Sequence, residues 1–188
     1  PAQGRNALTA LISLLAQNNI GGSMIKRLSG IYPYGEYDGT SAGIACSDSR
    51  SGALTSVLSI ASSEEGRAMF MSDTRIPLDR TAESIIALIA ANGIDGCAVM
   101  HSEPHAADED SEMVQTLLSV YEDVTGEKGR CLAIGGGTYV HDTAQGVAFG
   151  AEWEGTDNNM HGADEFIGLD EFRRDIIMYT EAILKLCT

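Results

Sequence analysis

The polar segment Met160-His161-Gly162-Ala163-Asp164-Glu165-Phe166 contains side chains that could bind a metal ion. The imidazole of His161 suits zinc, and the carboxylate of Glu165 is close enough in sequence to orient that imidazole. Taken alone, however, a loop histidine is more often an ordinary polar residue. Catalytic zinc uses about three protein ligands, so His161 could supply only part of such a site.

A glycine-rich segment is the second place where the sequence could do chemistry. Gly135-Gly136-Gly137-Thr138-Tyr139 directly follows the apolar run Cys131–Ile134. Without Cβ atoms, successive N–H groups can face a carboxylate or a tetrahedral oxyanion. A glycine-rich turn by itself is more often only a turn. A nucleotide-binding loop is the weaker interpretation, because the segment has neither G-x-G-x-x-G nor a P-loop lysine.

Four long helices are expected to position these segments. Apolar residues recur at helical spacing over 6–17, 81–91, 111–126 and 170–186, and Thr81 and Ser111 are suitable N-caps. A short helical turn is expected over 24–28. Segments with the apolar alternation of strands lie between these helices, so the chain is not predicted to be all-helical.

Strands are expected in both halves of the chain. Alternating apolar residues over 44–46, 54–60 and 68–71 predict a three-stranded antiparallel meander, and 97–100 predicts a fourth strand. Short strands are also expected over 131–134 and 147–150. The acidic segment around 103–110 is the best candidate for a domain boundary. The predicted fold class is therefore α+β over residues 1–104, with helices on one face of the sheet, followed by an α/β segment over 105–188.

Composition narrows the class of protein. The net charge of −15 and the pI near 4.4 argue against nucleic-acid binding, because clustered Lys and Arg are missing. The four cysteines have no C-x-x-C spacing, so they are expected to be reduced core residues of a cytoplasmic protein. The sequence contains no apolar stretch of the length that spans a membrane. The first residue is not Met, and the chain is expected to begin in mid-domain.

Three stretches resemble the PepV-like dipeptidases, which belong to the aminoacylase and carboxypeptidase superfamily of metallopeptidases (family M-twenty). Residues 1–7 resemble P-x-x-G-x-N-A, and 160–166 resemble M-H-x-x-N-E-F, with Asp164 in place of the usual Asn. Between them lie Met113-Val114-Gln115-Thr116-Leu117-Leu118, the triple glycine with Thr-Tyr, and Gly146-Val147-Ala148-Phe149-Gly150. The resemblance covers nearly the whole chain and corresponds to the C-terminal half of the family's enzymes.

The resemblance implies a division of labour within the chain. Residues 1–104 would be most of a ferredoxin-like lid domain, used for dimerisation and substrate binding. Residues 105–188 would be the last part of the catalytic metallopeptidase domain. His161 would bind one metal with Glu165 beside it, while Gly135, Gly136, Gly137 and Thr138 would contact substrate.

Arg75 is assigned a role by the same resemblance. Asp73-Thr74-Arg75-Ile76-Pro77 resembles the family's strand-end N-x-R-x-P, in which the arginine binds the terminal carboxylate of a dipeptide. A planar guanidinium suits this role because it pairs with a carboxylate through two hydrogen bonds. The alternative is an ordinary surface arginine at a strand end.

The resemblance also implies cofactors and partners. The intact enzyme would hydrolyse dipeptides or aminoacyl-peptides with water activated by two zinc ions, with manganese or cobalt as alternatives. Most catalytic residues would precede Pro1, so this chain alone is expected to bind no metal tightly and to be inactive. Expected partners are a dipeptide and a second copy bound through lid strand edges. The rival hypothesis is a non-enzymatic α+β module for dimerisation or anion binding.

Overall fold

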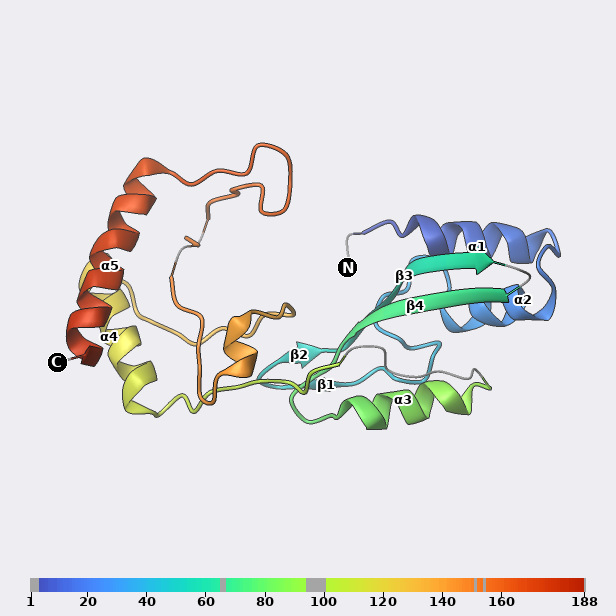
Figure 1. Cartoon of the computed structure of the whole chain (residues 1–188), viewed down its shortest axis with the longest axis horizontal. Helices are drawn as coiled ribbons and strands as arrows, with labels where there is room; N and C mark the ends of the chain where they lie inside the picture. Colours follow the sequence, from blue (N-terminus) through green and yellow to red (C-terminus); the bar gives the residue numbers. More distant parts are fainter. Residues whose placement is uncertain (1–3, 65–66, 94–100, 151, 154, 188) are drawn as a thin grey trace. The chain divides into compact units, whose positions relative to one another are not determined.

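The computed structural model describes residues 4–64, 67–93, 101–150, 152–153 and 155–187. The chain divides into two compact units (Figure 1). Unit 1 contains 1–105 and 133–136, and unit 2 contains 106–132 and 137–188. The identities of these units as a lid and a catalytic segment stay predictions.

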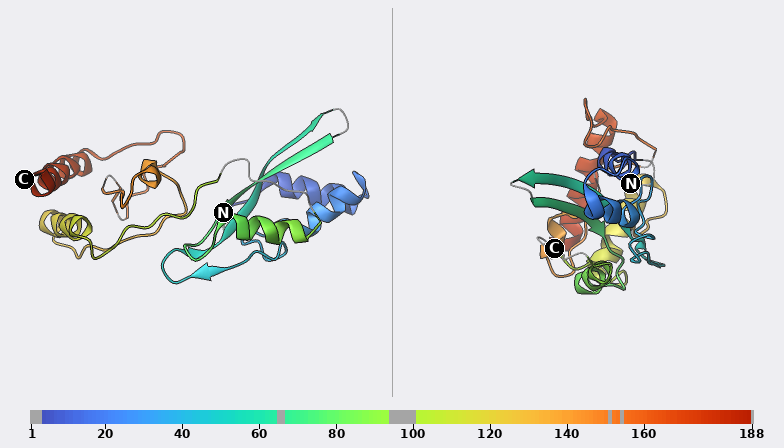
Figure 2. Two further views of the ribbon diagram at one scale, coloured as in Figure 1. Left: turned by 60° about the horizontal axis from the view of Figure 1, so that its bottom comes forward. Right: turned by 90° about the vertical axis from the view of Figure 1, so that its right-hand side faces the viewer.

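Within its described residues, unit 1 is built on a long β-hairpin and three helices. The helices are α1 (Ala7–Gln17), α2 (Gly22–Ile31) and α3 (Ala82–Ala91). The hairpin pairs β3 (Thr55–Glu64) with β4 (Arg67–Arg75) in antiparallel register, and its ribbon is clearest in Figure 2. A smaller two-stranded sheet joins β1 (Ser47–Asp48) to β2 (Gly52–Ala53). The prediction that this unit combines helices with antiparallel strands is confirmed.

The core of unit 1 joins its helices to one face of the hairpin. Ile12 of α1, Leu28 of α2, Leu58 of β3 and Ile85 of α3 are all at most 5% exposed and belong to one apolar cluster. Side chains alternate between the two faces of a strand, so a single apolar side of β3 suffices to hold the helices. A register shift between Leu58 and Ile60 interrupts this alternation and places Ile60 on the opposite face, where it is half exposed.

Asn6 begins α1 and also ties it to the hairpin. Its side-chain oxygen accepts hydrogen bonds from the backbone N–H groups of Leu8 and Thr9, which the first helical turn leaves without partners. Its Nδ2 donates to the carbonyl of Leu58 at 2.6 Å. The Asn of the P-x-x-G-x-N-A stretch therefore has a structural role in this chain.

The predicted three-stranded meander is wrong in its first strand. Residues 44–46 are not part of a strand, although Ile44 is buried in the core. The N–H of Ile44 donates to the carbonyl of Gly39 across a tight turn, and the φ angles of Gly39 and Gly43 are both 70°. Glycine is favoured there because it has no Cβ to clash. Pairing begins only after this turn, where the carbonyl of Cys46 accepts from the N–H of Leu54 at 2.9 Å. The strand predicted over 97–100 lies outside the described residues, so a ferredoxin-like order stays a prediction.

The turn between β1 and β2 is fastened by the carboxylate of Asp48. Asp48 accepts from the side chain and the N–H of Ser51, from the N–H of Arg50 at 2.6 Å, and from the N–H of Leu78 at 2.9 Å. These bonds, led by the one from the Ser51 hydroxyl, lower the pKa of Asp48 to about 2. The ionised carboxylate thus links two loops that lie 30 positions apart in the sequence.

Acidification is expected to remove the stabilisation that Asp48 provides. A lowered folded-state pKa means that this stabilisation is full above the ordinary carboxyl pKa of 3.8 and is lost as the pH falls towards about 2. Wild type should resist urea better than Asp48→Asn at about pH 6, and the difference should shrink below about pH 4. A difference that stays constant across this pH range would contradict the prediction.

The described residues of unit 2 form two packed helices and their connecting loops. Helices α4 (Glu112–Thr125) and α5 (Leu169–Cys187) bury Leu117, Val120, Met178 and Ala182 between them. A short 3-10 helix, η1 (Tyr139–Asp142), lies in the connection. The predicted helices over 111–126 and 170–186 are confirmed, and Ser111 caps α4 by accepting from the N–H of Val114.

The strands predicted over 131–134 and 147–150 are wrong for the described chain. Neither segment is in a strand, and Leu132 and Ile134 are 73% and 67% exposed. A strand needs a neighbouring strand to satisfy its backbone, and none of the strands in the described residues runs beside these segments. Val147 and Phe149 instead pack against the helical core of unit 2.

The segment after Phe149 is anchored on α5 by two aromatic residues. The hydroxyl of Tyr179 donates to the carbonyl of Phe149 at 3.0 Å, and Trp153 Nε1 donates to Asp175 Oδ1 at 3.1 Å. Asp175 is only 4% exposed, and its Oδ2 has no hydrogen-bond partner among the described residues. Burial, followed by the nearby charge of Asp175, raises the pKa of Tyr179.

The expectation that all cysteines are core residues is wrong for two of them. Cys131 and Cys187 are exposed, and Cys46 lies partly buried against the core of unit 1. An apolar neighbourhood in sequence does not bury a thiol unless another element covers it. Cys97 lies outside the described residues.

In the described part of the chain, no helix combines the length and apolar character needed to cross a membrane.

Candidate functional site

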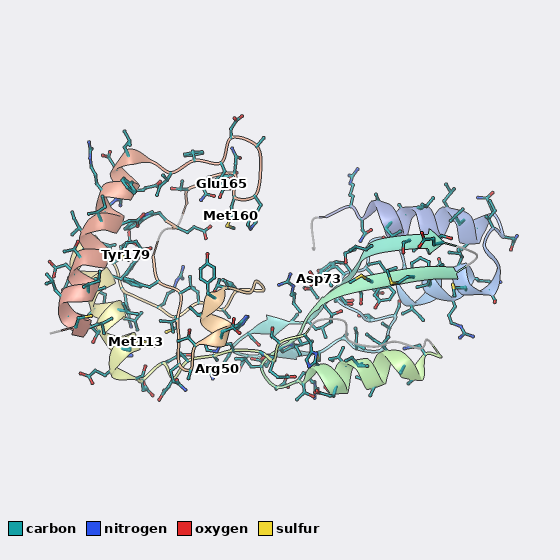
Figure 3. The ribbon with its side chains drawn as sticks, in the orientation of Figure 1. Arg50, Asp73, Met113, Met160, Glu165 and Tyr179 are labelled. Carbon is teal, nitrogen blue, oxygen red and sulfur yellow. The ribbon has the colours of Figure 1, made fainter. Side chains whose placement is uncertain are left out.

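The predicted metal ligand His161 lies in the exposed loop that precedes α5. Its φ angle is 63°, and Asn159 and Asp164 nearby also have positive φ angles of 56° and 57°. The carboxylate of Glu165 accepts a hydrogen bond from the backbone N–H of His161 at 3.4 Å. Glu165 therefore contacts the main chain at His161, and its predicted role beside the imidazole stays a prediction. Figure 3 labels Met160 and Glu165 in this loop.

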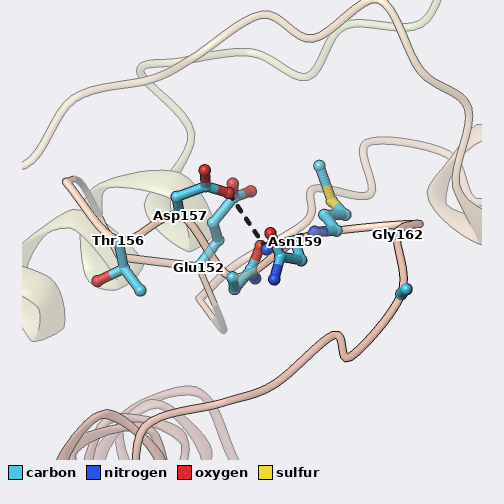
Figure 4. A pocket seen from close by; sticks show the side chains of 8 residues that line it. Glu152, Thr156, Asp157, Asn159 and Gly162 are labelled. Carbon is cyan, nitrogen blue, oxygen red and sulfur yellow. Dashed lines mark hydrogen bonds between the residues drawn. The ribbon is translucent and has the colours of Figure 1, made fainter.

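The same loop borders a polar hollow of about 420 Å³ in unit 2 (Figure 4). Oxygen-bearing side chains dominate its lining, which comprises Glu152, Thr156, Asp157, Asn158, Asn159, Met160, Gly162 and Ala163. Asp157 also accepts from the N–H of Asn159 at 3.2 Å, which holds the turn. Carboxylate and amide oxygens favour a cation or a polar ligand over an apolar one.

Helix α5 holds the end of this loop through one carboxylate. Glu171 accepts from the hydroxyl of Thr156 at 2.5 Å and from the N–H of Gly168 at 3.1 Å. An acidic residue in the first turn of a helix is also favoured by the helix dipole. The loop that contains His161 is therefore fastened to α5 at both of its ends.

The glycine-rich segment is exposed to solvent. Gly135, Gly136, Gly137 and Thr138 are all exposed, and a Cβ added at Gly135 or Gly136 would meet nothing within 4 Å. The chain's own packing therefore does not require glycine at these two positions. Thr138 caps η1, because its hydroxyl accepts from the N–H of Val140 at 3.4 Å.

The predicted carboxylate-binding residue Arg75 ends β4 in unit 1. Its Nε donates to Asp73 Oδ1 at 2.6 Å and its Nη2 donates to Asp73 Oδ2 at 2.9 Å. This hydrogen bonding raises the pKa of Arg75, which therefore remains a cation throughout the physiological range. Sequence reasoning did not single out Asp73, although its spacing of two from Arg75 on a strand puts both side chains on one face.

The structure does not bring all predicted site residues together in one unit. Arg75, Gly135 and Gly136 lie in unit 1, whereas Gly137, Thr138, His161 and Glu165 lie in unit 2. The convergence of the glycine segment and His161 on one cleft, on which the peptidase hypothesis depends, stays a prediction. The exposure of His161 leaves its imidazole accessible to an ion.

A group of possible metal ligands that the sequence did not indicate lies on unit 1. One ligand atom each from Glu83, His101 and Glu103 lies within 4.8 Å of the others, and all three residues are exposed. His101 Nε2 is 3.9 Å from Glu83 Oε1. Glu83 on α3 is far from His101 in sequence, so no spacing rule connects them.

Comparison with known proteins identifies the class of enzyme to which the chain is related. The relatives are dipeptidases, and the resemblance to PepV-like dipeptidases inferred from the motifs is thereby confirmed. Beta-Ala-Xaa dipeptidase of Lactobacillus delbrueckii subsp. lactis is 35% identical over 193 aligned residues. That match covers 99% of this chain and 41% of the Lactobacillus protein.

Two further relatives support the same class. Putative dipeptidase YtjP of Bacillus subtilis (strain 168) is 33% identical over 156 residues, which is 81% of this chain and 33% of that protein. Putative dipeptidase SH1171 of Staphylococcus haemolyticus (strain JCSC1435) is 36% identical over 99 residues, or 53% of this chain and 21% of that protein. No family model matches the sequence. In all three alignments, the chain spans less than half the length of the relative.

Proposed function

We propose that this chain forms part of a metal-dependent dipeptidase. Residues 1–104 serve as a substrate-binding lid, and 105–188 as the last segment of the catalytic domain. The observation that carries the proposal is the alignment of 99% of the chain with Beta-Ala-Xaa dipeptidase at 35% identity. The proposed substrates are dipeptides, whose terminal carboxylate would pair with Arg75 while the N–H groups of the glycine segment face the reacting carbonyl.

The metal chemistry of the proposed enzyme cannot be completed by this chain. His161 is the one metal ligand that the motifs assign to the chain, and the oxygen donors of the same loop, such as Asp157, are exposed. A catalytic zinc site needs about three protein ligands and a position for water. In the described part of the chain, His161 does not belong to a group of three such donors, so the chain by itself is proposed to be inactive.

The chain alone is expected to show no hydrolysis of β-alanyl-leucine when zinc, manganese or cobalt is added. Substantial turnover would contradict the proposal that essential ligands are missing. The measurement is release of free leucine, with Beta-Ala-Xaa dipeptidase as the positive control. A binding module would also give no turnover, so a chimaeric protein is needed to separate the two hypotheses.

This chimaera tests the enzymatic role directly. In Beta-Ala-Xaa dipeptidase, the 41% that aligns with this chain would be replaced by the chain itself. The chimaera should hydrolyse β-alanyl-leucine, and His161→Ala in it should reduce kcat/KM by more than about a hundredfold, since even residues that only orient metal ligands cost about 10- to 100-fold. A folded chimaera without activity would favour the non-enzymatic module, whereas an active chimaera indifferent to His161→Ala would contradict the proposed metal-binding role of His161.

A further inference from the structure

The ion pair between Asp73 and Arg75 lies on the outward face of the β-hairpin (Figure 3 labels Asp73). In the register of the hairpin, Arg75 is opposite Thr55 and Asp73 is opposite Val57. The intervening Thr74 faces the other way, where its hydroxyl is hydrogen-bonded to the buried Ser56. The side chains of Arg75 and Asp73 remain 49% and 46% exposed, so a ligand in solution can reach them.

Asp73 uses only part of the hydrogen-bonding capacity of Arg75. A guanidinium has five N–H groups, and Asp73 accepts one from Nε and one from Nη2. The remaining end of the group, formed by Nη1 and the second N–H of Nη2, can still pair with another carboxylate through two hydrogen bonds. The contact with Asp73 therefore orients the guanidinium without closing the edge that an incoming carboxylate would use.

Two opposing effects decide what Asp73 does to carboxylate binding. Its negative charge repels an incoming carboxylate, but both partners are half exposed and water screens that repulsion. Its bidentate contact holds a long side chain that would otherwise have to be ordered by the ligand. Water weakens the repulsion but leaves the ordering of the side chain in place, which favours pre-organisation.

We propose that Asp73 is a positioning residue that fixes the guanidinium of Arg75 for the terminal carboxylate of a peptide ligand. This inference rests on the proposed function, in which Arg75 binds the carboxylate of a dipeptide. It adds a residue for which neither the motifs nor the relatives provide a role. Asp73 acts through Arg75 and does not itself contact the ligand.

The test compares ligands and variants in the isolated 188-residue chain. β-alanyl-leucine and its C-terminal amide would be titrated separately, and binding would be followed by the ¹⁵N–¹H NMR signals of the arginine side chains. Wild type should bind the acid more tightly than the amide. Asp73→Ala should weaken binding of the acid about fivefold and leave binding of the amide unchanged.

Asp73→Asn provides the conservative variant. Its side-chain oxygen can still accept from Arg75, so it should restore part of the affinity lost in Asp73→Ala. Because Asp73 is half exposed, both variants are expected to keep the wild-type backbone amide spectrum. Equal or tighter binding of the acid by Asp73→Ala would show that Asp73 competes with the ligand, and would overturn the proposal.

Failure of the underlying function gives a different result. If wild type does not distinguish the acid from the amide, or if Arg75→Ala keeps the preference for the acid, then Arg75 is not the carboxylate site. Both the role of Arg75 and the positioning role of Asp73 would then be rejected. If the preference depends on Arg75 but not on Asp73, only the positioning role is rejected.

Discussion

Ile12→Ala is expected to destabilise unit 1 by about 3 kcal/mol, within the range of roughly 2–5 kcal/mol typical of large-to-small changes in a core. Ile12 is 1% exposed on α1 and belongs to the cluster that contains Leu28 and Leu58. The substitution removes buried apolar surface and leaves a cavity that rigid neighbours fill only in part. The measurement is urea unfolding, monitored through the hydrogen exchange of the backbone amides of α1 and β3.

The neighbouring residue on the same helix is the matched control. Leu11 is 51% exposed, so Leu11→Ala should cost less than about 1 kcal/mol. Both substitutions place alanine in the middle of α1, and helix propensity therefore contributes little to the difference. Equal destabilisation by the two variants would show that α1 does not pack through Ile12.

Met178→Ala is expected to remove most of the stability of unit 2. Met178 is 1% exposed between α4 and α5, and the buried cluster contains only three further residues among those described. A loss of about 3 kcal/mol is large for a small unit, whose total stability is on the order of 5 kcal/mol. Trp153 is the single tryptophan of the chain and lies in unit 2, so its fluorescence during urea unfolding reports on this unit.

Ile177→Ala is the control for this experiment. Ile177 directly precedes Met178 on α5 but is 54% exposed. Replacing Ile177 should shift the urea midpoint of the fluorescence transition only slightly, because little of the surface of this side chain is buried. A larger effect at Ile177 than at Met178 would mean that α5 presents a different face to α4.

The helices could be predicted from the sequence because their signals are local. Asn6, Thr81 and Ser111 each accept a hydrogen bond from an N–H in the first turn that follows them. Such a cap acts over about three residues, and apolar spacing acts over a few turns. The expected short turn at 24–28 proved to be the longer helix α2, which shows that helix ends are less predictable than helix presence.

The strands were predicted less well because a strand depends on distant residues. The run over 131–134 has the composition of a buried strand, yet Leu132 and Ile134 are mostly exposed and no described strand pairs with them. By contrast, β3 and β4 are close in sequence and pair with each other. Apolar composition indicates that a segment can be buried, but only a neighbouring strand satisfies its N–H and C=O groups.

The sequence alone determined the helical caps, the pairing of two adjacent strands and the relationship to dipeptidases, since these depend on nearby residues or on the order of motifs. Tertiary structure decided the partners of individual side chains. Asp73 meets Arg75, Asp48 reaches the N–H of Leu78, and Glu165 contacts the backbone of His161. Such contacts are set by folded geometry, in which a change of register or turn exchanges one partner for another.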